Sequence, residues 1–341
     1  MATTHTRKGF LRLDMNESVE GLPESFVREV LDNIKPENIA SYPEYDEITA
    51  MIAASFGLAP ENVLVSNGSD AAIKHLFEAY VDVDDNVLLT DPTFAMYPVY
   101  SKIVRAREVA VPYNDDLSFP FDAFRHAIEH SRPKLAVVVN PNNPTGSKLE
   151  QTAIRSLAVA CRKQDSLLVV DEAYFHYLEE TAVALVPEFD NVVILRTFSK
   201  LSGLAGLRIG YALAHAEVIS AMGKVKSTFD VNCLAVVMAT ALLARPEILR
   251  DQLASVGEGK RWLLEKLDAR GISCVAGHAN FVLIDCGERC TEVAEMLKKD
   301  NILVGAGFSQ PFLKKYLRVT VAGPEIMKQF WQSFARFDFN S

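Results

Sequence analysis

The stretch 196–210, RTFSKLSGLAGLRIG, combines groups that bind anions with an amine that can act as a nucleophile. Thr197, Ser199 and Arg208 can each donate a hydrogen bond to a phosphate oxygen. Lys200 follows an apolar run typical of a buried strand, where an amine loses charge and can form a Schiff base with an aldehyde. Pyridoxal 5'-phosphate (PLP) requires such a combination of phosphate site and lysine. An ordinary surface turn is the alternative interpretation of this stretch taken alone.

Short apolar runs typical of strands alternate with segments of helical periodicity. The expected strands include 63–65, 86–90, 107–111, 135–139, 167–170, 192–195 and 211–214. This alternation predicts an α/β protein with a mainly parallel sheet covered by helices on both faces. Ligands bind outside the carboxyl ends of the strands in such sheets. We therefore expect one cleft that contains Gly68, Ser69, Phe94, Asn143, Asp171, Tyr174, Ser199 and Lys200.

The types of several of these residues suit a phosphorylated pyridine. Gly68 and Ser69 form a turn between a strand and a helix, which points backbone N–H groups and the helix dipole at an anion. Asp171 can keep a pyridine nitrogen protonated, and Phe94 offers a flat face for the ring. Each residue taken singly could equally be a helix cap, a core side chain or a turn former. Their joint order at strand ends favours the cofactor.

Composition limits the remaining possibilities. The 341 residues allow two domains or one large unit, and the net charge of −9 (35 basic, 44 acidic residues) without long charged runs argues against nucleic-acid and membrane partners. No apolar run approaches the roughly 18 residues of a membrane span, and the N-terminus lacks a signal-peptide pattern. The five cysteines are scattered, with Cys286 and Cys290 four residues apart, which indicates reduced thiols in the cytoplasm and no metal site.

We expect three parts along the chain. Residues 1–25 form an N-terminal arm whose one patterned piece is LRLDMNES, and residues 26–245 form a large cofactor-binding domain. Residues 246–341 form a smaller C-terminal domain that packs with the arm, after a helical region interrupted near Pro246. The stretch DPTFAMYPVY is rich in turn formers and aromatic residues and is expected as a turn region.

Several motifs resemble those of a known enzyme family. NPNNPTG, DEAY, and S-K followed by G-L-R are similar to the fold-type I PLP aminotransferases. LDMNES, SYPEYD, VSNGSD, DPTFAMY and LRVT resemble the histidinol-phosphate aminotransferase branch, and the resemblance covers residues 11–336. It implies a central sheet sandwiched by helices, a smaller α+β domain, and ping-pong transfer of an amino group from a donor to a 2-oxo acid.

The resemblance also assigns the cofactor residues. Lys200 is expected to form the Schiff base and Asp171 to pair with the pyridine nitrogen, with both Asn143 and Tyr174 near the 3-oxygen. Tyr42 matches a tyrosine that the neighbouring subunit contributes to the phosphate, which implies a homodimer with shared active sites. The residues expected around the phosphate are Gly68, Ser69, Asp70, Thr197, Ser199 and Arg208.

The substrate end departs from the family pattern. By the resemblance, Arg318 binds the substrate, with Asn16 and Glu17 nearby. Glu20 stands where the branch usually has a tyrosine, and Gly305 where it has an arginine that binds the substrate phosphate. Loss of such a charge-assisted bond costs roughly 1.5–3 kcal/mol. We therefore expect a small amino acid or amine other than histidinol phosphate, with Glu17 or Glu20 facing a basic side chain.

Two further functions stay open at this point. PLP activates several bonds at Cα, so a decarboxylase similar to threonine-phosphate decarboxylase, or another Cα reaction, is one alternative. A non-catalytic ligand-binding protein with the PLP fold is another, although the complete set of Lys200, Asp171 and Tyr174 favours catalysis. A dinucleotide-dependent dehydrogenase is disfavoured because no G-x-G-x-x-G pattern follows the first strand.

Overall fold

The central feature of the computed structural model, which describes residues 7–178 and 180–339, is a seven-stranded sheet. Its strand order is β2 (Val63–Ser66), β8 (Gly210–Ala214), β7 (Val192–Thr197), β6 (Leu167–Asp171), β5 (Leu135–Val139), β3 (Asn86–Asp91) and β4 (Arg107–Pro112). Only β8 runs antiparallel to its neighbours, and the remaining strand pairs are parallel. The prediction of an α/β fold with a mainly parallel central sheet is confirmed.

Alternate side chains of each strand pack on opposite faces of the sheet. In β5, Ala136 and Val138 join one apolar core, whereas Val137 and Val139 join the other. The first core is covered by α1 (Glu24–Asp32), α3 (Asp46–Ser55), α6 (Phe121–Ser131), α7 (Gln151–Lys163) and α9 (Cys233–Leu243). The second is covered by α4 (Gly68–Tyr80), α5 (Met96–Ile103) and α8 (Ala216–Val225). Burial on both faces explains why these strands are continuously apolar.

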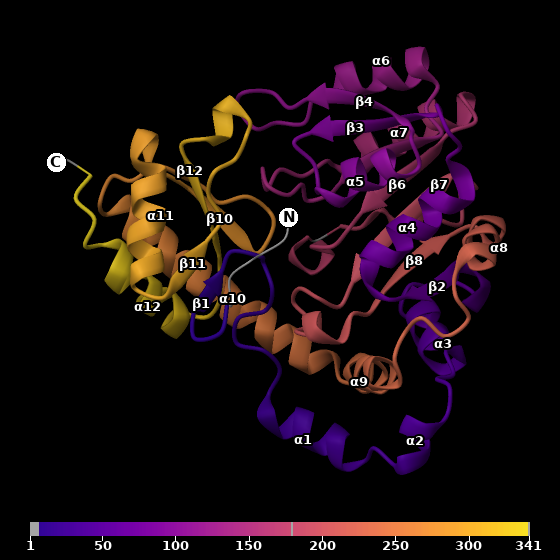
Figure 1. Ribbon diagram of the computed structural model, residues 1–341, viewed down its shortest axis with the longest axis horizontal. Coiled ribbons are helices and arrows are strands. Elements are labelled where there is room, and N and C mark those ends of the chain that lie inside the picture. The colour runs from indigo at the N-terminus through magenta and orange to yellow at the C-terminus, as the bar shows by residue number, and fades with distance from the viewer. Residues whose placement is uncertain (1–6, 179, 340–341) are drawn as a thin grey trace.

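A smaller group of elements, which we call the small lobe, lies beside the part built on this sheet, the large lobe (Figure 1). Its strands are β9 (Cys274–Val275), β10 (Phe281–Asp285) and β12 (Tyr316–Thr320) in one antiparallel sheet, and β1 (Leu11–Leu13) with β11 (Ile302–Val304) in a parallel pair. Its helices are α10 (Pro246–Asp268), α11 (Cys290–Lys299) and α12 (Pro324–Phe334).

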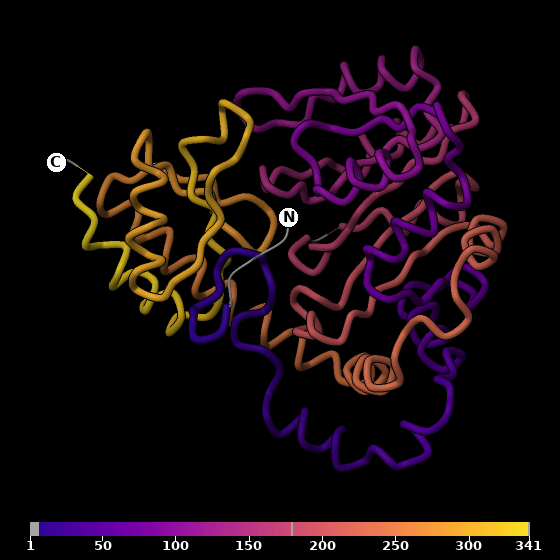
Figure 2. The backbone as a smooth tube through the Cα atoms, viewed as in Figure 1, coloured from indigo at the N-terminus to yellow at the C-terminus, as the bar shows by residue number. Residues whose placement is uncertain are grey.

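The N-terminal segment and α10 connect the two lobes. The chain passes from β1 in the small lobe to α1 and the short α2 (Pro36–Ala40) below the large lobe, and returns along α10 (Figures 1 and 2). The expected arm therefore contains a strand, β1, which pairs with β11. Leu13 of this strand is fully buried in the core of the small lobe. Residues 1–6 of that arm and residues 340–341 lie outside the described part. The domain limits at 25/26 and 245/246 stay a proposal, which the start of α10 at Pro246 supports.

One predicted turn region is a helix instead. Residues 91–100 contain the start of α5, and Pro98 occupies its first turn, where the missing N–H has no intrahelical partner. Tyr97 is fully buried against the sheet, so tertiary packing determines the conformation of this stretch. In the described part of the chain no helix is both long and apolar enough to cross a membrane.

A buried ion pair joins the ends of two neighbouring strands. Arg196 on β7 donates to Glu172 Oε2 through Nη2 at 2.7 Å and through Nε at 3.1 Å, and both side chains are fully buried. Arg196 also donates to Thr181 Oγ1, and its guanidinium lies 3.7 Å from the ring centre of Phe175. Removal of one partner of such a pair costs about 3–5 kcal/mol because the other charge stays buried. The pair therefore holds β6 and β7 in a fixed relation.

Candidate active site

A cavity lies at the carboxyl ends of the parallel strands of the large lobe. All of the residues expected to bind the cofactor lie in its lining except Gly68 and Tyr42. The lining residues are Ser69, Asp70, Phe94, Val139, Asn143, Asp171, Ala173, Tyr174, Thr197, Ser199, Lys200 and Arg208. The sheet topology thus brings together side chains that are far apart in the sequence, from Ser69 to Arg208.

One end of the cavity carries donors suited to an anion. Arg208 donates from Nη1 to Ser199 Oγ at 3.2 Å and from Nη2 to Asp70 Oδ2 at 3.2 Å, while Thr197 Oγ1 donates to Ser199 Oγ at 2.9 Å. Gly68 begins α4 with φ +77°, and a Cβ there would lie 2.6 Å from Arg208 Nη2. Glycine is therefore needed to place the guanidinium beside the N-terminus of this 13-residue helix.

A second feature of the cavity is a buried carboxylic acid, Asp171, at the end of β6. Asp171 accepts a hydrogen bond from Tyr97 Oη at 2.8 Å and one from the Ala173 N–H at 3.1 Å. Burial raises the pKa of Asp171 to about 6, and these two hydrogen bonds act in the opposite direction. Tyr97 was not among the expected site residues. Its position three residues after Phe94 would have been a signal only if the stretch had been predicted as a helix.

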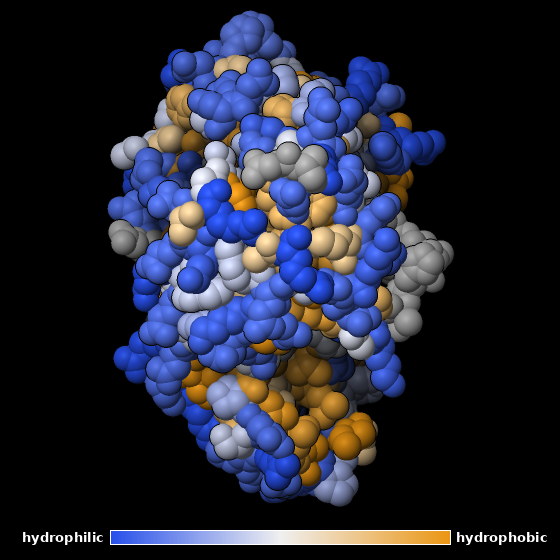
Figure 3. Space-filling model, turned by 90° about the vertical axis from the view of Figure 1, so that its left-hand side faces the viewer, coloured by the Kyte–Doolittle hydropathy of each residue, from blue (hydrophilic) through white to orange (hydrophobic). Residues whose placement is uncertain are grey.

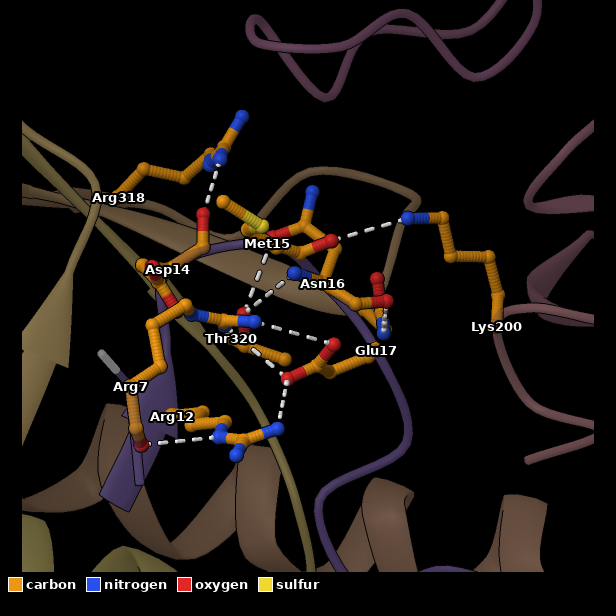
Figure 4. A network of polar contacts seen from close by, with 10 residues as sticks. Arg7, Arg12, Asp14, Met15, Asn16, Glu17, Lys200, Arg318 and Thr320 are labelled. Carbon is orange, nitrogen blue, oxygen red and sulfur yellow. Dashed lines mark hydrogen bonds and ion pairs between the residues drawn. The ribbon is translucent and has the colours of Figure 1, made fainter. Parts of the chain in front are cut away.

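The N-terminal segment closes over the lysine (Figure 4). Lys200 Nζ donates to the carbonyl oxygen of Met15 at 3.0 Å and lies 5.5 Å from the ring centre of Tyr174. Asn16, which has φ +58°, donates from Nδ2 to Tyr174 Oη at 2.9 Å. It also contacts the small lobe, because its backbone N–H donates to Thr320 Oγ1 at 3.1 Å. Asn16 thus connects Tyr174, in the cavity lining of the large lobe, with Thr320 of the small lobe.

Arg318, on β12 of the small lobe, does not line the cavity itself but bonds to Asn143, which does. Its Nη1 donates to Asn143 Oδ1 and its Nη2 to the carbonyl oxygen of Asp14, each at 2.5 Å. Its Nε is buried and has no hydrogen-bond partner among the residues that the structure describes. Gly305 pairs with Arg318 through two backbone hydrogen bonds, and a Cβ at Gly305 would lie 3.2 Å from Nε. The position beside the guanidinium therefore carries no side chain.

The acidic residues expected near the substrate lie elsewhere. Glu17 pairs with Arg7 at 3.0 Å and with Arg12 at 3.8 Å (Figure 4), and Glu20 accepts the Gly323 N–H at 3.2 Å at the start of α12. Neither lines the cavity around Lys200. The role of Glu17 or Glu20 opposite a basic substrate side chain stays a prediction, and these contacts do not favour it.

Tyr42 also lies outside the cavity. Its side chain is 74% exposed, and its ring stacks on that of Phe229 with centroids 4.2 Å apart. This exposure suits a side chain that acts in a neighbouring subunit, as expected from the sequence. The placement in one chain does not test that role.

The groups around the cavity fit PLP. Hydroxyls, a guanidinium and a helix N-terminus suit its phosphate, Asp171 suits the pyridine nitrogen, and Lys200 suits the aldehyde. Within residues 7–178 and 180–339, no group of three or more His, Cys, Asp and Glu side chains could hold a metal ion.

The chain is similar to known aminotransferases over most of its length. The family described as "Aminotransferase class I and II" matches residues 8–328. The histidinol-phosphate aminotransferase of Caldanaerobacter subterraneus subsp. tengcongensis is 35% identical over 317 residues, which covers 92% of this chain and 89% of the relative. Histidinol-phosphate aminotransferase 1 of Carboxydothermus hydrogenoformans is 33% identical, with 94% and 90% covered.

Solved structures share the fold. The histidinol-phosphate aminotransferase of Sinorhizobium meliloti in complex with pyridoxal-5'-phosphate superposes with a TM-score of 0.87 at 24% identity, covering 95% of this chain and 89% of the other. The enzyme of Clostridium acetobutylicum superposes with a TM-score of 0.86 at 19% identity, covering 95% and 98%. The chain thus belongs to the aminotransferase class I and II family, in its histidinol-phosphate aminotransferase branch, and is a fold-type I transaminase whose cofactor is PLP.

Proposed function

We propose that this transaminase moves an amino group between a small amino acid and a 2-oxo acid, both of which bind through a carboxylate at Arg318. The observation that carries the proposal is the buried Nε of Arg318, which has no partner among the described residues and lies on a side chain bonded to the cavity residue Asn143. A buried donor without a partner is costly, and a substrate carboxylate would supply the missing acceptor.

The residues of the cavity have separate proposed roles in transamination. PLP, when bound, supplies an aldehyde for the substrate amine and a ring that withdraws electrons from Cα. We propose that Lys200 Nζ holds the cofactor and then moves the proton at the substrate Cα. Asp171 would face the pyridine nitrogen as a carboxylate, and Tyr174 and Asn143 would bind the 3-oxygen. Gly68, Ser69, Asp70, Thr197, Ser199 and Arg208 would hold the phosphate, and Phe94 would pack on the ring.

The N-terminal segment completes the substrate end. Asn16 holds the hydroxyl of Tyr174, and the carbonyl oxygen of Asp14 orients the guanidinium of Arg318. Together with the bond from Lys200 to the Met15 carbonyl oxygen, these contacts hold the segment between Lys200 and Arg318 (Figure 4). Glu17 pairs with Arg7 and Arg12, which neutralise its negative charge, so Glu17 does not attract a basic group of the substrate.

Histidinol phosphate is the second candidate for the donor. It is favoured by the names of relatives that are up to 35% identical to this chain. It is disfavoured by Gly305, since the position next to Arg318 offers no second cation for a phosphate dianion. A decarboxylase or another Cα reaction has no comparable support from the relatives.

We also propose a homodimer in which Tyr42 reaches the cofactor phosphate of the partner subunit. Exposed apolar side chains support it: Ile39 on α2, Tyr42 and Phe229 are 68%, 74% and 48% exposed. Figure 3 shows hydrophobic side chains gathered at the lower end of the molecule, at the height where α1 and α2 lie in Figure 1. Contiguous exposed apolar surface is typical of protein interfaces. A cytoplasmic location and the absence of nucleic-acid and membrane partners stay predictions from composition.

The substrate proposal predicts the outcome of half-reactions with an amine panel. Amino acids should bleach the visible absorbance of the bound cofactor faster than histidinol or histidinol phosphate, because Arg318 binds one carboxylate. Arg318→Gln should raise half-saturation by amino acids roughly 10- to 100-fold, as expected for a lost charged hydrogen bond of about 1.5–3 kcal/mol. It should leave an uncharged amine unaffected. Stopped-flow absorbance with mass identification of the oxo products measures both.

The matched control for this variant is Arg12→Gln. Arg12 is exposed in the same network and bonds to the Arg7 carbonyl oxygen and to Glu17, whereas Arg318 bonds to Asn143 of the cavity lining. Its panel should match that of the unchanged chain. A strong preference for histidinol phosphate over every amino acid would overturn the substrate proposal, and release of carbon dioxide in place of an oxo product would favour the decarboxylase.

The dimer proposal predicts complementation between two inactive chains. Lys200→Ala lacks the amine, and Tyr42→Phe lacks the hydroxyl for the partner's phosphate, so each homodimer should have low activity. A mixed dimer contains one site with both Lys200 and Tyr42, and activity should return after the two variants are unfolded and refolded together. Light scattering should give the mass of two chains. A monomer in solution, or no gain on mixing, contradicts the proposal.

The buried acid predicts a change in the pH profile. Tyr97→Phe removes a hydrogen bond that opposes the rise in the pKa of Asp171. The pKa of Asp171 should therefore rise further, by roughly 1–2 units for a bond to a charged group. Because the carboxylate is the active form, the acid limb of the half-reaction rate should move to higher pH in this variant.

Tyr100→Phe is the control for this prediction, since Tyr100 lies on the same helix but packs on Phe77 with ring centroids 6.1 Å apart. Its acid limb should not move. An unchanged limb in Tyr97→Phe, or a shift to lower pH, would show that Tyr97 does not control the charge of Asp171.

A further inference from the structure

The segment between α8 and α9, residues 226–232, is held by charged side chains that the proposed reaction does not use. Lys226 Nζ lies 2.6 Å from Asp230 Oδ1, and both side chains are largely buried. Asp230 Oδ2 lies 3.6 Å from Nε2 of His75, a buried side chain on α4. We call Lys226, Asp230 and His75 the buried charge cluster. Separation of the pair would leave a buried charge without a partner, so the cluster holds the segment in place.

Tyr45 joins the same segment to the start of α3. Its hydroxyl donates to the carbonyl oxygen of Val231 at 3.1 Å and accepts the N–H of Val231 at 3.2 Å. Lys226 Nζ lies 4.8 Å from the centre of the Tyr45 ring, within the range of a cation–π contact. Tyr45 comes three residues after Tyr42. The chain around Tyr42 therefore lies beside the segment that carries the buried charge cluster.

The residue before Asp230 is the one on which Tyr42 packs. The rings of Tyr42 and Phe229 stack with centroids 4.2 Å apart and planes 15° apart. Both rings are exposed, so no apolar core surrounds them. The direction of the Tyr42 side chain thus depends on the position of Phe229. The position of Phe229 depends in turn on Asp230, the neighbouring residue that the buried charge cluster holds.

We propose that Asp230 is a positioning residue for the cofactor site of the neighbouring subunit. Through Phe229, Asp230 holds Tyr42 in the direction in which its hydroxyl reaches the cofactor phosphate of the partner. This inference rests on the proposed homodimer and adds to it the groups that direct Tyr42. The buried charge cluster of one chain then acts on the phosphate site of the other chain.

The buried charge cluster also borders groups around the cavity of its own chain. His75 lies on α4, and Ser69 near the start of this helix lines the cavity. Asn232 donates from Nδ2 to the carbonyl oxygen of Leu207, directly before Arg208, at 3.0 Å. A cluster that acted through these contacts would change the site of its own chain. The two routes therefore predict effects on different subunits.

Other contacts already hold the groups of the same chain. Arg208 bonds to Ser199 and to Asp70. The helix α4 packs on the sheet through four fully buried apolar side chains, Ala72, Ile73, Leu76 and Phe77. Tyr42 has no comparable apolar surroundings and stacks on Phe229 at the surface. We therefore expect the effect of Asp230 in the neighbouring subunit.

Mixed dimers of full-length chains separate the two routes. One chain carries Lys200→Ala and supplies Tyr42 to the working site, and the other carries Tyr42→Phe and supplies Lys200. Asp230→Asn is added to one chain or to the other, and the two chains are refolded together with PLP. The readouts are the half-saturation of the restored transamination by PLP and the rate at saturating PLP. Half-saturation does not depend on how much mixed dimer forms.

The expected result depends on which chain carries the change. With Asp230→Asn in the Lys200→Ala chain, half-saturation by PLP should rise roughly 3- to 10-fold, as expected for a phosphate hydrogen bond that is weakened rather than lost. The rate at saturating PLP should stay the same. With Asp230→Asn in the Tyr42→Phe chain, half-saturation should not change.

Phe229→Ala tests the ring contact without a change in the buried charge cluster, and the exposed position of Phe229 makes its removal compatible with folding. In the Lys200→Ala chain it should raise half-saturation as Asp230→Asn does, whereas Phe229→Tyr keeps a flat ring and should not. Asp84→Asn is the matched control, because Asp84 forms an exposed ion pair with Arg107 at 3.2 Å. It should have no effect in either chain.

A rise in half-saturation that is equal for both placements of Asp230→Asn, or larger in the Tyr42→Phe chain, would overturn the proposal and show that the cluster acts on its own chain. Loss of the dimer mass in Phe229→Ala, measured by light scattering, would overturn it as well, because the segment would then hold the interface rather than Tyr42. If Lys200→Ala and Tyr42→Phe regain no activity together even without a further change, the homodimer proposal itself fails, and the role of Asp230 fails with it.

Discussion

The buried ion pair between Glu172 and Arg196 is the interaction on which the catalytic geometry depends. It fixes the carboxyl ends of β6 and β7 relative to each other. Both side chains are fully buried, so either charge would be strongly destabilising without the other. Asp171 directly precedes Glu172, and Thr197 directly follows Arg196. Asp171 and the residues that lead to Lys200 therefore extend from the two partners of one pair, and Asn143 lies in the loop after the adjacent strand β5.

The parallel sheet supplies only some of the residues around Lys200, because the N-terminal segment and the small lobe supply the others. β12 of the small lobe and the N-terminal segment meet the large lobe through polar contacts and through two small apolar clusters, one around Leu117 and Leu283 and one around Tyr174 and Phe281. Asn16 is part of this connection, because it bonds to Tyr174 on one side and to Thr320 on the other. Asn280 adds a bond from its side-chain amide to the Asn16 carbonyl oxygen at 3.0 Å. This arrangement links Tyr174 of the large lobe with Thr320 and Asn280 of the small lobe through Asn16.

Much of the cofactor site could be predicted from the sequence because its residues follow apolar strands directly, and parallel strands end at one edge. Tyr97 was missed since the two prolines and the aromatic residues of its stretch indicate a turn, whereas burial against the sheet makes it a helix. Its bond to Asp171 joins residues 74 positions apart, which no local pattern shows. The pairing of Glu172 with Arg196, 24 positions away, is a tertiary contact of the same kind.

The substrate end was the least predictable part. The sequence predicts that Glu17 or Glu20 faces the substrate, and this stays a prediction; in the structure Glu17 pairs with Arg7 and Arg12, and Glu20 bonds to the N-terminus of α12. Such choices depend on which cation lies nearest after folding. The role proposed for Tyr42, which is exposed in the single chain, requires a second subunit.

We propose that one amine, Lys200 Nζ in the turn after β7, holds the cofactor. Borohydride reduction of the holoenzyme fixes a Schiff base as a stable secondary amine, and peptide mapping then locates it. We expect a single pyridoxyl-modified peptide, with the modification on Lys200. Modification of another lysine, or complete release of the cofactor after reduction, would show that Lys200 does not hold it.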